Sequence, residues 1–533
     1  MGIISQDFNP WLRSRFPQIF VDPLRSGVRN DAVVLIIDGS LFIRSVRQWT
    51  GTWAEVLIEL CSRLDNLLSE FPALEVLVFR IDAYGGDHVI QCKAKDACHA
   101  KRYSEAPPLP DGLHPDELYQ PCSKCDGITQ EMTFGHMANR IAFNAMVSRA
   151  LFAWAKRVCR VHNNGTLSVI LEGVVHGRAV TSSPIIVCAQ DDDATGQKVA
   201  VHGDFKFPDH IPGPCMHSEG DIGLVFWTQF FSNLATVVYS CDTDLLIALL
   251  FHMRRMSESG IEYSKVPPLT LYKVVPLASY YIDIKLAFLI IFAAFAQHHA
   301  TAHPIEVFAF LYTCCGNDFC QPYCNSEEKD NGIRFPAVLA AYEKYSAEIG
   351  PLFEMPHSGA PLYTYGEQRF QTIQYTARIH TERVRALMIG AADLQAKYDS
   401  LKAVAKKELL FDNAYFNAQV ARCSWTIGYY ANAGVPGLAY ARGDEVSERT
   451  GKSLHGWAYT AKKELLRTSD VHCSYVHANG DETLPPTPID VQLHEKAISA
   501  HGDATQKLLT NFKQYASSQD KRGVVLSSLV YGK

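Results

Sequence analysis

The 533-residue chain has no apolar run long enough to cross a bilayer, since the most apolar one, residues 286–296, is too short. It has no charged-then-apolar leader and misses the myristoylation pattern, so we expect neither secretion nor a membrane anchor. The formal net charge of −6 excludes a protein that coats nucleic acid by charge alone. The 15 cysteines lack regular spacing and fit a reducing compartment. We therefore expect a cytoplasmic protein, without excluding the nucleus.

Three apolar runs have the length of buried strands: residues 31–38, 74–81 and 167–171. An acid stands at or just after the end of each run: Asp38, Asp82 and Glu172. A helical pattern over residues 53–68 separates the first two runs, which is the order of a βαβ unit. We expect an α/β fold with a central, mostly parallel sheet flanked by helices, followed by a mainly helical region from about residue 336.

The stretch 238–250 places Asp242 and Asp244 between two apolar runs. In open α/β sheets ligands bind at the carboxyl ends of the strands, where two carboxylates can hold a hard divalent cation. The alternative is that Asp244 only caps the following helix, which is the commoner role of an isolated Asp-x-Asp.

Seven acids stand at the ends of expected elements: Asp38, Asp82, Glu219, Asp221, Asp242, Asp244 and Asp318. Each alone has a structural explanation; Glu219 and Asp221, for example, suit the first turn of a helix. Four of the seven follow strands of one expected sheet, so they should converge on one edge. Converging carboxylates repel one another unless cations neutralise them. Two Mg²⁺ or Mn²⁺ ions about 4 Å apart would do so and would support phosphodiester hydrolysis.

In this order the motifs resemble those of the XRN family of 5′→3′ exoribonucleases, within the wider flap-endonuclease and PIN-like nucleases. The segments that carry the resemblance are residues 1–3, 11–17, 38–40, 79–82, 218–221, 240–244, 315–319, 424–430 and 434–436. The Gly-Asn-Asp-Phe at 316–319 favours XRN enzymes over flap endonucleases. The resemblance ends near residue 445 and is interrupted at 176–215. The chain would be a divergent, compact member, for which a viral origin is one expectation.

The resemblance implies an XRN-like nuclease core over residues 1–335, in which 176–215 is a surface insertion. A helical second region, 336–445, would complete the active-site pocket, and 446–533 would be a C-terminal extension. The implied activity is Mg²⁺-dependent 5′→3′ degradation of single-stranded, 5′-monophosphorylated RNA to mononucleotides by two-metal hydrolysis. The seven acids would be the catalytic metal ligands.

The resemblance also implies a basic pocket for the 5′-monophosphate, formed by Lys93, Lys95, Lys101 and Arg102; a solvated basic loop is the alternative. Two positions depart from the family. Arg44 stands where XRN enzymes have a base-stacking His, and Leu438 stands near the family's stacking Trp. An arginine plane can stack on a base, whereas leucine offers no aromatic face. Trp425 and Tyr440 are the other candidate substrate-binding residues.

Two further interpretations remain open. Cys122 and Cys125 have the spacing of zinc ligands, and Cys92, Cys98 and His99 lie upstream, but unpaired thiols are the alternative. The chain could instead be a flap-endonuclease-like DNA nuclease, although residues 245–317 lack the expected Gly-rich hairpin. The third candidate is a nuclease fold retained as a structural or RNA-binding protein, which the changes at Arg44 and Leu438 would favour.

Overall fold

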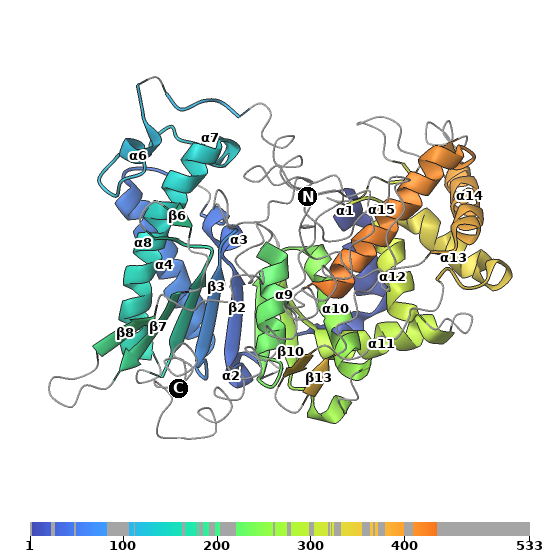
Figure 1. The fold of residues 1–533 in the computed structure, drawn as a ribbon, viewed down its shortest axis with the longest axis horizontal. Coiled ribbons are helices and arrows are strands. Elements are labelled where there is room, and N and C mark those ends of the chain that lie inside the picture. Colours follow the sequence, from blue (N-terminus) through green and yellow to red (C-terminus); the bar gives the residue numbers. More distant parts are fainter. Residues whose placement is uncertain are drawn as a thin grey trace, which may run out of the picture.

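A computed structural model describes most of the first 433 residues. The described residues are 3–22, 27–46, 49–82, 106–110, 112–162, 166–176, 179–180, 185–190, 198–202, 220–258, 262–273, 279–297, 303–317, 320, 322–323, 332–353, 363–365, 368–370, 379–398 and 409–433. Helices and strands in these ranges form one layered α/β body with a helical region at one end (Figure 1).

Nine strands of the described chain form one mixed sheet in the order β1-β11-β10-β9-β2-β3-β4-β7-β8. Their bounds, in that order, are Phe20–Val21, Tyr280–Asp283, Leu269–Lys273, Thr236–Ser240, Val34–Asp38, Val76–Arg80, Ser168–Glu172, Ile185–Gln190 and Lys198–His202. The five central strands, β10 to β4, run parallel, whereas the strands on both sides of them pair antiparallel. The carboxyl ends of the parallel strands therefore meet at one edge of the sheet.

The longer helices are α1 (Ile3–Arg15), α4 (Trp53–Ser69), α8 (Met137–Val161), α9 (Gly220–Phe230), α10 (Thr243–Glu258), α11 (Ile284–Gln297), α12 (Pro304–Thr313), α13 (Phe335–Ile349), α14 (Thr381–Tyr398) and α15 (Asn413–Asn432). The shorter elements are α2 (Val28–Asp31), α3 (Gly39–Arg44), α6 (Pro115–Leu118), α7 (Gln130–Gly135), two 3₁₀ turns (Pro17–Ile19, Tyr263–Lys265) and the hairpins β5–β6 (Val175–His176, Ala179–Val180) and β12–β13 (Tyr363–Tyr365, Gln368–Phe370).

The alternation of side chains along β2 divides the core in two. Leu35 and Ile37 belong to a cluster with α4 and α8, whereas Val34 and Ile36 belong to a cluster with α9 to α12. Because helices cover both faces of β2, side chains on both faces are buried. The sequence of the strand is therefore a continuous apolar run. The second cluster continues into α1 and α13 to α15, which lie at the far end of the molecule from α8 (Figure 1).

The structure confirms the expected α/β class, with helices on both faces of a sheet whose centre is parallel. The expectation of a surface insertion over 176–215 is wrong for its described part. β7 pairs antiparallel with β4, and its residues Ile186, Val187 and Cys188 are buried. The apolar run at 185–188 continues the sheet because β4 still offers an open edge to pair with. No helix of the described residues is long and apolar enough to span a membrane.

Candidate active site

Four of the seven predicted acids lie at the carboxyl-end edge of the sheet, and we call them the carboxylate edge: Asp38, Asp82, Asp242 and Asp244. Asp38 ends β2, Asp82 follows β3 by two positions, Asp242 follows β9 by two, and Asp244 lies in the first turn of α10. Asp82 and Asp244 are buried, and Asp38 and Asp242 are half-buried. The parallel strands therefore place all four acids at one edge of the sheet, while their convergence on a metal stays a prediction.

Two serine hydroxyls tie the strand ends together. The Ser240 hydroxyl donates to Asp38 Oδ2 at 3.4 Å and accepts the backbone N–H of Asp242 at 3.1 Å. The Ser40 hydroxyl accepts the backbone N–H of Asp82 at 2.9 Å. The Ser240 hydroxyl thus links β9 to β2. The Ser40 hydroxyl links Asp82, two positions after β3, to the start of α3. Both linking hydroxyls are uncharged.

Two of the acids also begin helices. Asp38 Oδ1 accepts the N–H of Leu41 at 3.0 Å and caps α3, while Asp242 Oδ1 accepts the N–H of Asp244 at 2.9 Å at the start of α10. The alternative that Asp244 is the capping residue is therefore wrong, because Asp242 accepts that bond. A carboxylate has a second oxygen, so a capping role is compatible with a ligand on the same side chain.

Asp244 lies between two tyrosines. Tyr312 of α12 donates its hydroxyl to Asp244 Oδ1, and the hydroxyl of Tyr430 of α15 also hydrogen-bonds to Asp244. Burial, and then the charge of Asp244, raise the pKa of Tyr430 well above its usual value, so this phenol remains protonated. Asn317 donates its side-chain N–H to the Tyr430 hydroxyl at 2.8 Å. Segments 240–244 and 424–430 of the expected motif set thus meet at one carboxylate, and segment 315–319 is connected to it through the Tyr430 hydroxyl.

The turn at Gly316 fixes the orientation of Asn317. Gly316 has φ = +95°, and a Cβ at this position would lie 2.7 Å from Pro322 Cδ. The Asn317 carboxamide accepts the N–H of Cys320 at 2.7 Å, and the Asn317 N–H donates to the Cys320 carbonyl at 2.8 Å. A glycine is therefore required here both for its backbone conformation and for space. Asp318, the next residue, lies outside the described part of the chain.

Lys273 is a buried lysine at the same edge, at the end of β10 and level with Ser240 of β9. Its Nζ donates to Thr243 Oγ1 at 2.5 Å and to Asn9 Oδ1 of α1 at 3.3 Å. Burial lowers its pKa to about 8, and the nearby charge of Asp242 partly opposes this shift. Sequence reasoning missed Lys273, although residues 269–273 show the signal used for the acids, an apolar run that ends in a charged residue.

A second group of buried charges, the Arg80 cluster (Arg80, Glu172 and Trp227), lies at the ends of β3 and β4. Arg80 Nη1 is 2.9 Å from Glu172 Oε1, and both side chains are fully buried. Trp227 of α9 donates its indole N–H to Glu172 Oε2 at 2.6 Å. A Cβ on Gly223 would lie 2.0 Å from Arg80 Nε, so the guanidinium occupies the space beside this helix. Glu172, the last residue of β4, therefore forms an ion pair inside the protein.

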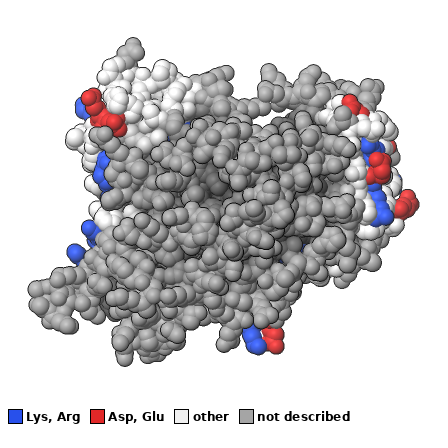
Figure 2. Space-filling view, in the orientation of Figure 1, with Lys and Arg blue, Asp and Glu red and all other residues white. Residues whose placement is uncertain are grey.

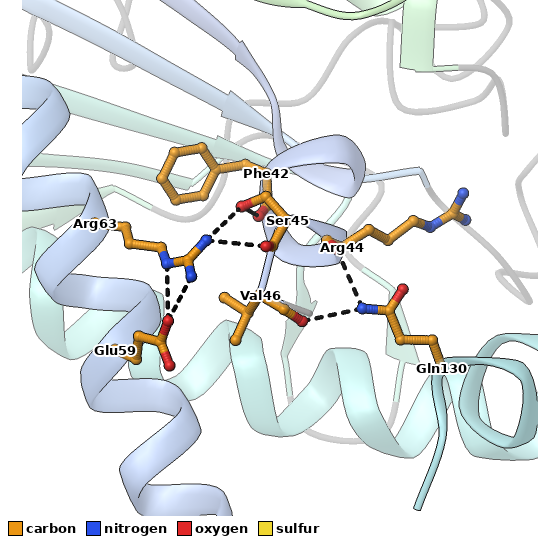
Figure 3. Close-up of polar contacts among 7 residues, drawn as sticks. All are labelled: Phe42, Arg44, Ser45, Val46, Glu59, Arg63 and Gln130. Carbon is orange, nitrogen blue, oxygen red and sulfur yellow. Dashed lines mark hydrogen bonds and ion pairs between the residues drawn. The ribbon is translucent and has the colours of Figure 1, made fainter. Parts of the chain in front are cut away.

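Arg44 is the last residue of α3, the helix that Asp38 caps. Gln130 of α7 donates to the carbonyl oxygens of Arg44 and Val46, and Arg63 of α4 donates to the Ser45 carbonyl at 2.9 Å (Figure 3). These contacts fix the backbone, while the Arg44 side chain extends away from α4 (Figure 3). Its guanidinium lies 4.9 Å from the centre of the Phe134 ring, so it stacks on an aromatic side chain of the protein itself.

The Arg44 guanidinium borders a small pocket. The lining residues are Ser40, Ile43, Arg44, Ile81, Phe134, Arg140 and Asn144. The space measures about 10 Å³, roughly what one water molecule needs, so a base would enter only if side chains moved. The role of Arg44 as a base-stacking residue therefore stays a prediction.

The carboxylate edge fits a hard cation in its chemistry, because its side-chain donors are carboxylate oxygens. In the described residues, however, no group of three or more His, Cys, Asp or Glu side chains is arranged to hold a metal ion. Glu219 and Asp318, and the side chain of Asp221, lie outside what the structure describes. A two-metal centre would need these three acids in addition to the four of the carboxylate edge.

The remaining substrate-binding predictions fall outside the described structure. They are Lys93, Lys95, Lys101, Arg102, Leu438 and Tyr440, together with the side chain of Trp425. For the predicted zinc site, Cys122 is exposed and Cys125 is buried, and burial raises the pKa of the Cys125 thiol. Cys92, Cys98 and His99 are not described. The predicted zinc site therefore stays a prediction, with unpaired thiols as its alternative.

Comparison with known proteins does not assign the chain to a family. No family model matches the chain, and a search of the curated proteins finds no match. On the face shown in Figure 2, the described charged residues lie at the periphery; lysine or arginine lies beside acids at the top left, the right and the bottom, and stands without an adjacent acid along the left edge. The XRN resemblance therefore rests on the sequence motifs and stays a prediction.

Proposed function

We propose that the chain is a metal-dependent nuclease that hydrolyses the phosphodiester bonds of single-stranded RNA from a 5′-monophosphate end. The observation that carries the proposal is the junction at Asp244. There the Asp-x-Asp segment, the Gly-Asn turn and α15 are connected through the Tyr312 and Tyr430 hydroxyls. These segments lie far apart in the sequence, so their connection around one carboxylate supports a shared site over separate structural roles.

Each described residue has a role in this proposal. Asp38, Asp82, Asp242 and Asp244 would hold the cations, completed by Glu219, Asp221 and Asp318. When bound, Mg²⁺ or Mn²⁺ would supply the positive charge that activates water and stabilises the leaving oxygen. Tyr312 and Tyr430 orient Asp244, and Ser240 sets the separation of Asp38 and Asp242. Arg44, together with Lys93, Lys95, Lys101 and Arg102, would bind the 5′-terminal nucleotide and its phosphate.

One substrate panel tests the proposal. The protein is incubated with Mg²⁺ and 5′-phosphate RNA, 5′-triphosphate RNA, 5′-phosphate DNA or a DNA flap, and Asp242→Ala/Asp244→Ala serves as the control. We expect mononucleotides from the 5′-phosphate RNA alone and none with the control. Preference for the flap would indicate a DNA nuclease. Equal inertness of both proteins would instead indicate a structural or RNA-binding role.

A further inference from the structure

Lys273 has an unusual position for a lysine. It is 1% exposed, yet its two hydrogen bonds go to uncharged oxygens, Thr243 Oγ1 and Asn9 Oδ1. In the described residues no carboxylate forms an ion pair with it at contact distance. Burying an ammonium group away from water costs several kcal/mol unless opposite charge lies near.

The opposite charge comes from Asp242 and Asp244, which flank the residue that Lys273 holds. Both carboxylates act on the Lys273 ammonium through space, Asp242 the more strongly. The other cation whose charge reaches Lys273 is Arg13 of α1. Because Thr243 stands between the two acids, Lys273 is attached to the middle of the Asp-x-Asp segment and faces it with a positive charge.

We propose that Lys273 is a positioning residue that serves as the resident counter-cation of Asp242 and Asp244, and that it lowers their affinity for a divalent ion. The inference rests on the proposed function and deepens it. Without metal, the ammonium balances part of the charge of the pair and holds the first turn of α10. With metal, the ammonium and the ion repel each other, so binding is weaker than the carboxylates alone would allow. Weaker binding permits exchange of the ion.

A purely structural lysine would behave in the opposite way. If Lys273 only anchored Thr243 and Asn9, its removal would loosen the site and leave metal affinity unchanged or weaker. If it is a counter-cation, a neutral replacement makes divalent ions bind more tightly, although the metal-free protein becomes less stable. The sign of the change in metal affinity separates the two roles.

The experiment measures Mn²⁺ binding at pH 7 by electron paramagnetic resonance of the unbound ion, with the full chain. The variants are Lys273→Gln, which keeps hydrogen-bonding capacity, and Lys273→Met, which suits a buried position; either one suffices if the other does not fold. We expect both to bind Mn²⁺ about tenfold more tightly than wild type, as one nearby unit charge predicts. Lys273→Arg, which keeps the charge, should stay within about twofold of wild type.

Two controls locate the effect. Lys285→Gln removes a lysine charge that lies on α11 and donates to the Val266 carbonyl, and it should leave Mn²⁺ affinity unchanged. Asp242→Asn/Asp244→Asn should abolish the binding. Equal or weaker binding by the neutral Lys273 variants would overturn this inference alone. If wild type bound no Mn²⁺, both this inference and the proposed metal centre would fail.

Discussion

Two groups of buried charges at the same edge of the sheet are neutralised in different ways. In the Arg80 cluster the guanidinium contacts Glu172 directly at 2.9 Å, and Trp227 binds the other carboxylate oxygen. Around β9 and β10, Asp242 and Asp244 are bound by backbone N–H and hydroxyl groups, while Lys273 bonds to neutral oxygens between them and α1. The first group pairs its charges in contact, and the second keeps them apart.

Under the proposed function, this difference separates charges that stabilise the fold from charges that bind a ligand. In a buried ion pair the two charges in contact neutralise each other within the protein. Removal of one partner therefore leaves the other charge buried without a counter-charge, which destabilises the fold. Carboxylates held by neutral donors keep their negative charge available to a ligand, at some expense in stability. We therefore expect substitutions in the Arg80 cluster to change folding, and substitutions at Asp242 and Asp244 to change chemistry more than folding.

The largest expected effect is on stability, from Glu172→Ala. It leaves the Arg80 guanidinium buried without its partner, and we expect the free energy of unfolding to fall by about 3–5 kcal/mol. Urea unfolding followed by circular dichroism measures this. The matched control is Glu262→Gln, which breaks the exposed pair with Lys265 and should cost about 0–1 kcal/mol. Similar losses for both variants would contradict the structural role of the Arg80 cluster.

The next effect concerns chemistry. Asp244→Asn keeps the shape of the side chain and can still accept the Tyr312 hydroxyl, but it removes the charge. We expect cleavage of 5′-phosphate RNA to slow by roughly 10³-fold, or about 4 kcal/mol in activation free energy. The unfolding free energy should change much less. A variant that cleaves RNA at the wild-type rate would remove Asp244 from the proposed active site.

The central sheet was predictable because its signals are local. Residues 34–38 and 76–80 are largely continuous apolar runs, as strands buried on both faces must be, and Asp38 and Asp82, at or just after their ends, mark the edge. The contacts that shape the site are not local: Tyr312 and Tyr430 reach Asp244 from 68 and 186 positions away. No pattern around Tyr312 distinguishes it from the apolar residues of α12, since only helix packing decides which side chain meets the carboxylate.

The incorrect predictions also depend on features that the local sequence does not show. The segment 185–190 shows no acid or motif, so its place in the sheet depends on the edge that β4 leaves open. Which of Asp242 and Asp244 caps α10 depends on the residue at which the helix begins, and composition does not fix that within two positions.

A smaller effect tests the space beside Arg80. Gly223→Ala places a methyl group 2.0 Å from Arg80 Nε, and the guanidinium, held by Glu172, cannot move aside freely. We expect a loss of about 1–3 kcal/mol in unfolding free energy. In the background of Glu172→Ala the same substitution should cost less, because Arg80 is released. Additive losses in this double-mutant cycle would show that Gly223 and Glu172 do not act through Arg80.

The smallest expected effect is a pH dependence at Lys273. Its pKa is about 8 in the folded protein, lowered mainly by burial, against 10.5 as the ordinary value. Between these values the unfolded chain keeps the proton that the folded protein loses, so stability rises with pH across this window. Relative to Lys273→Met, metal-free wild type should gain about 1.4 kcal/mol between pH 7 and pH 9. Parallel stability curves for the two proteins would mean that Lys273 is not held as a buried ammonium. A gain confined to wild type would show that Lys273 is held as a buried ammonium at the end of β10, unlike the Arg80 guanidinium, which contacts Glu172 directly.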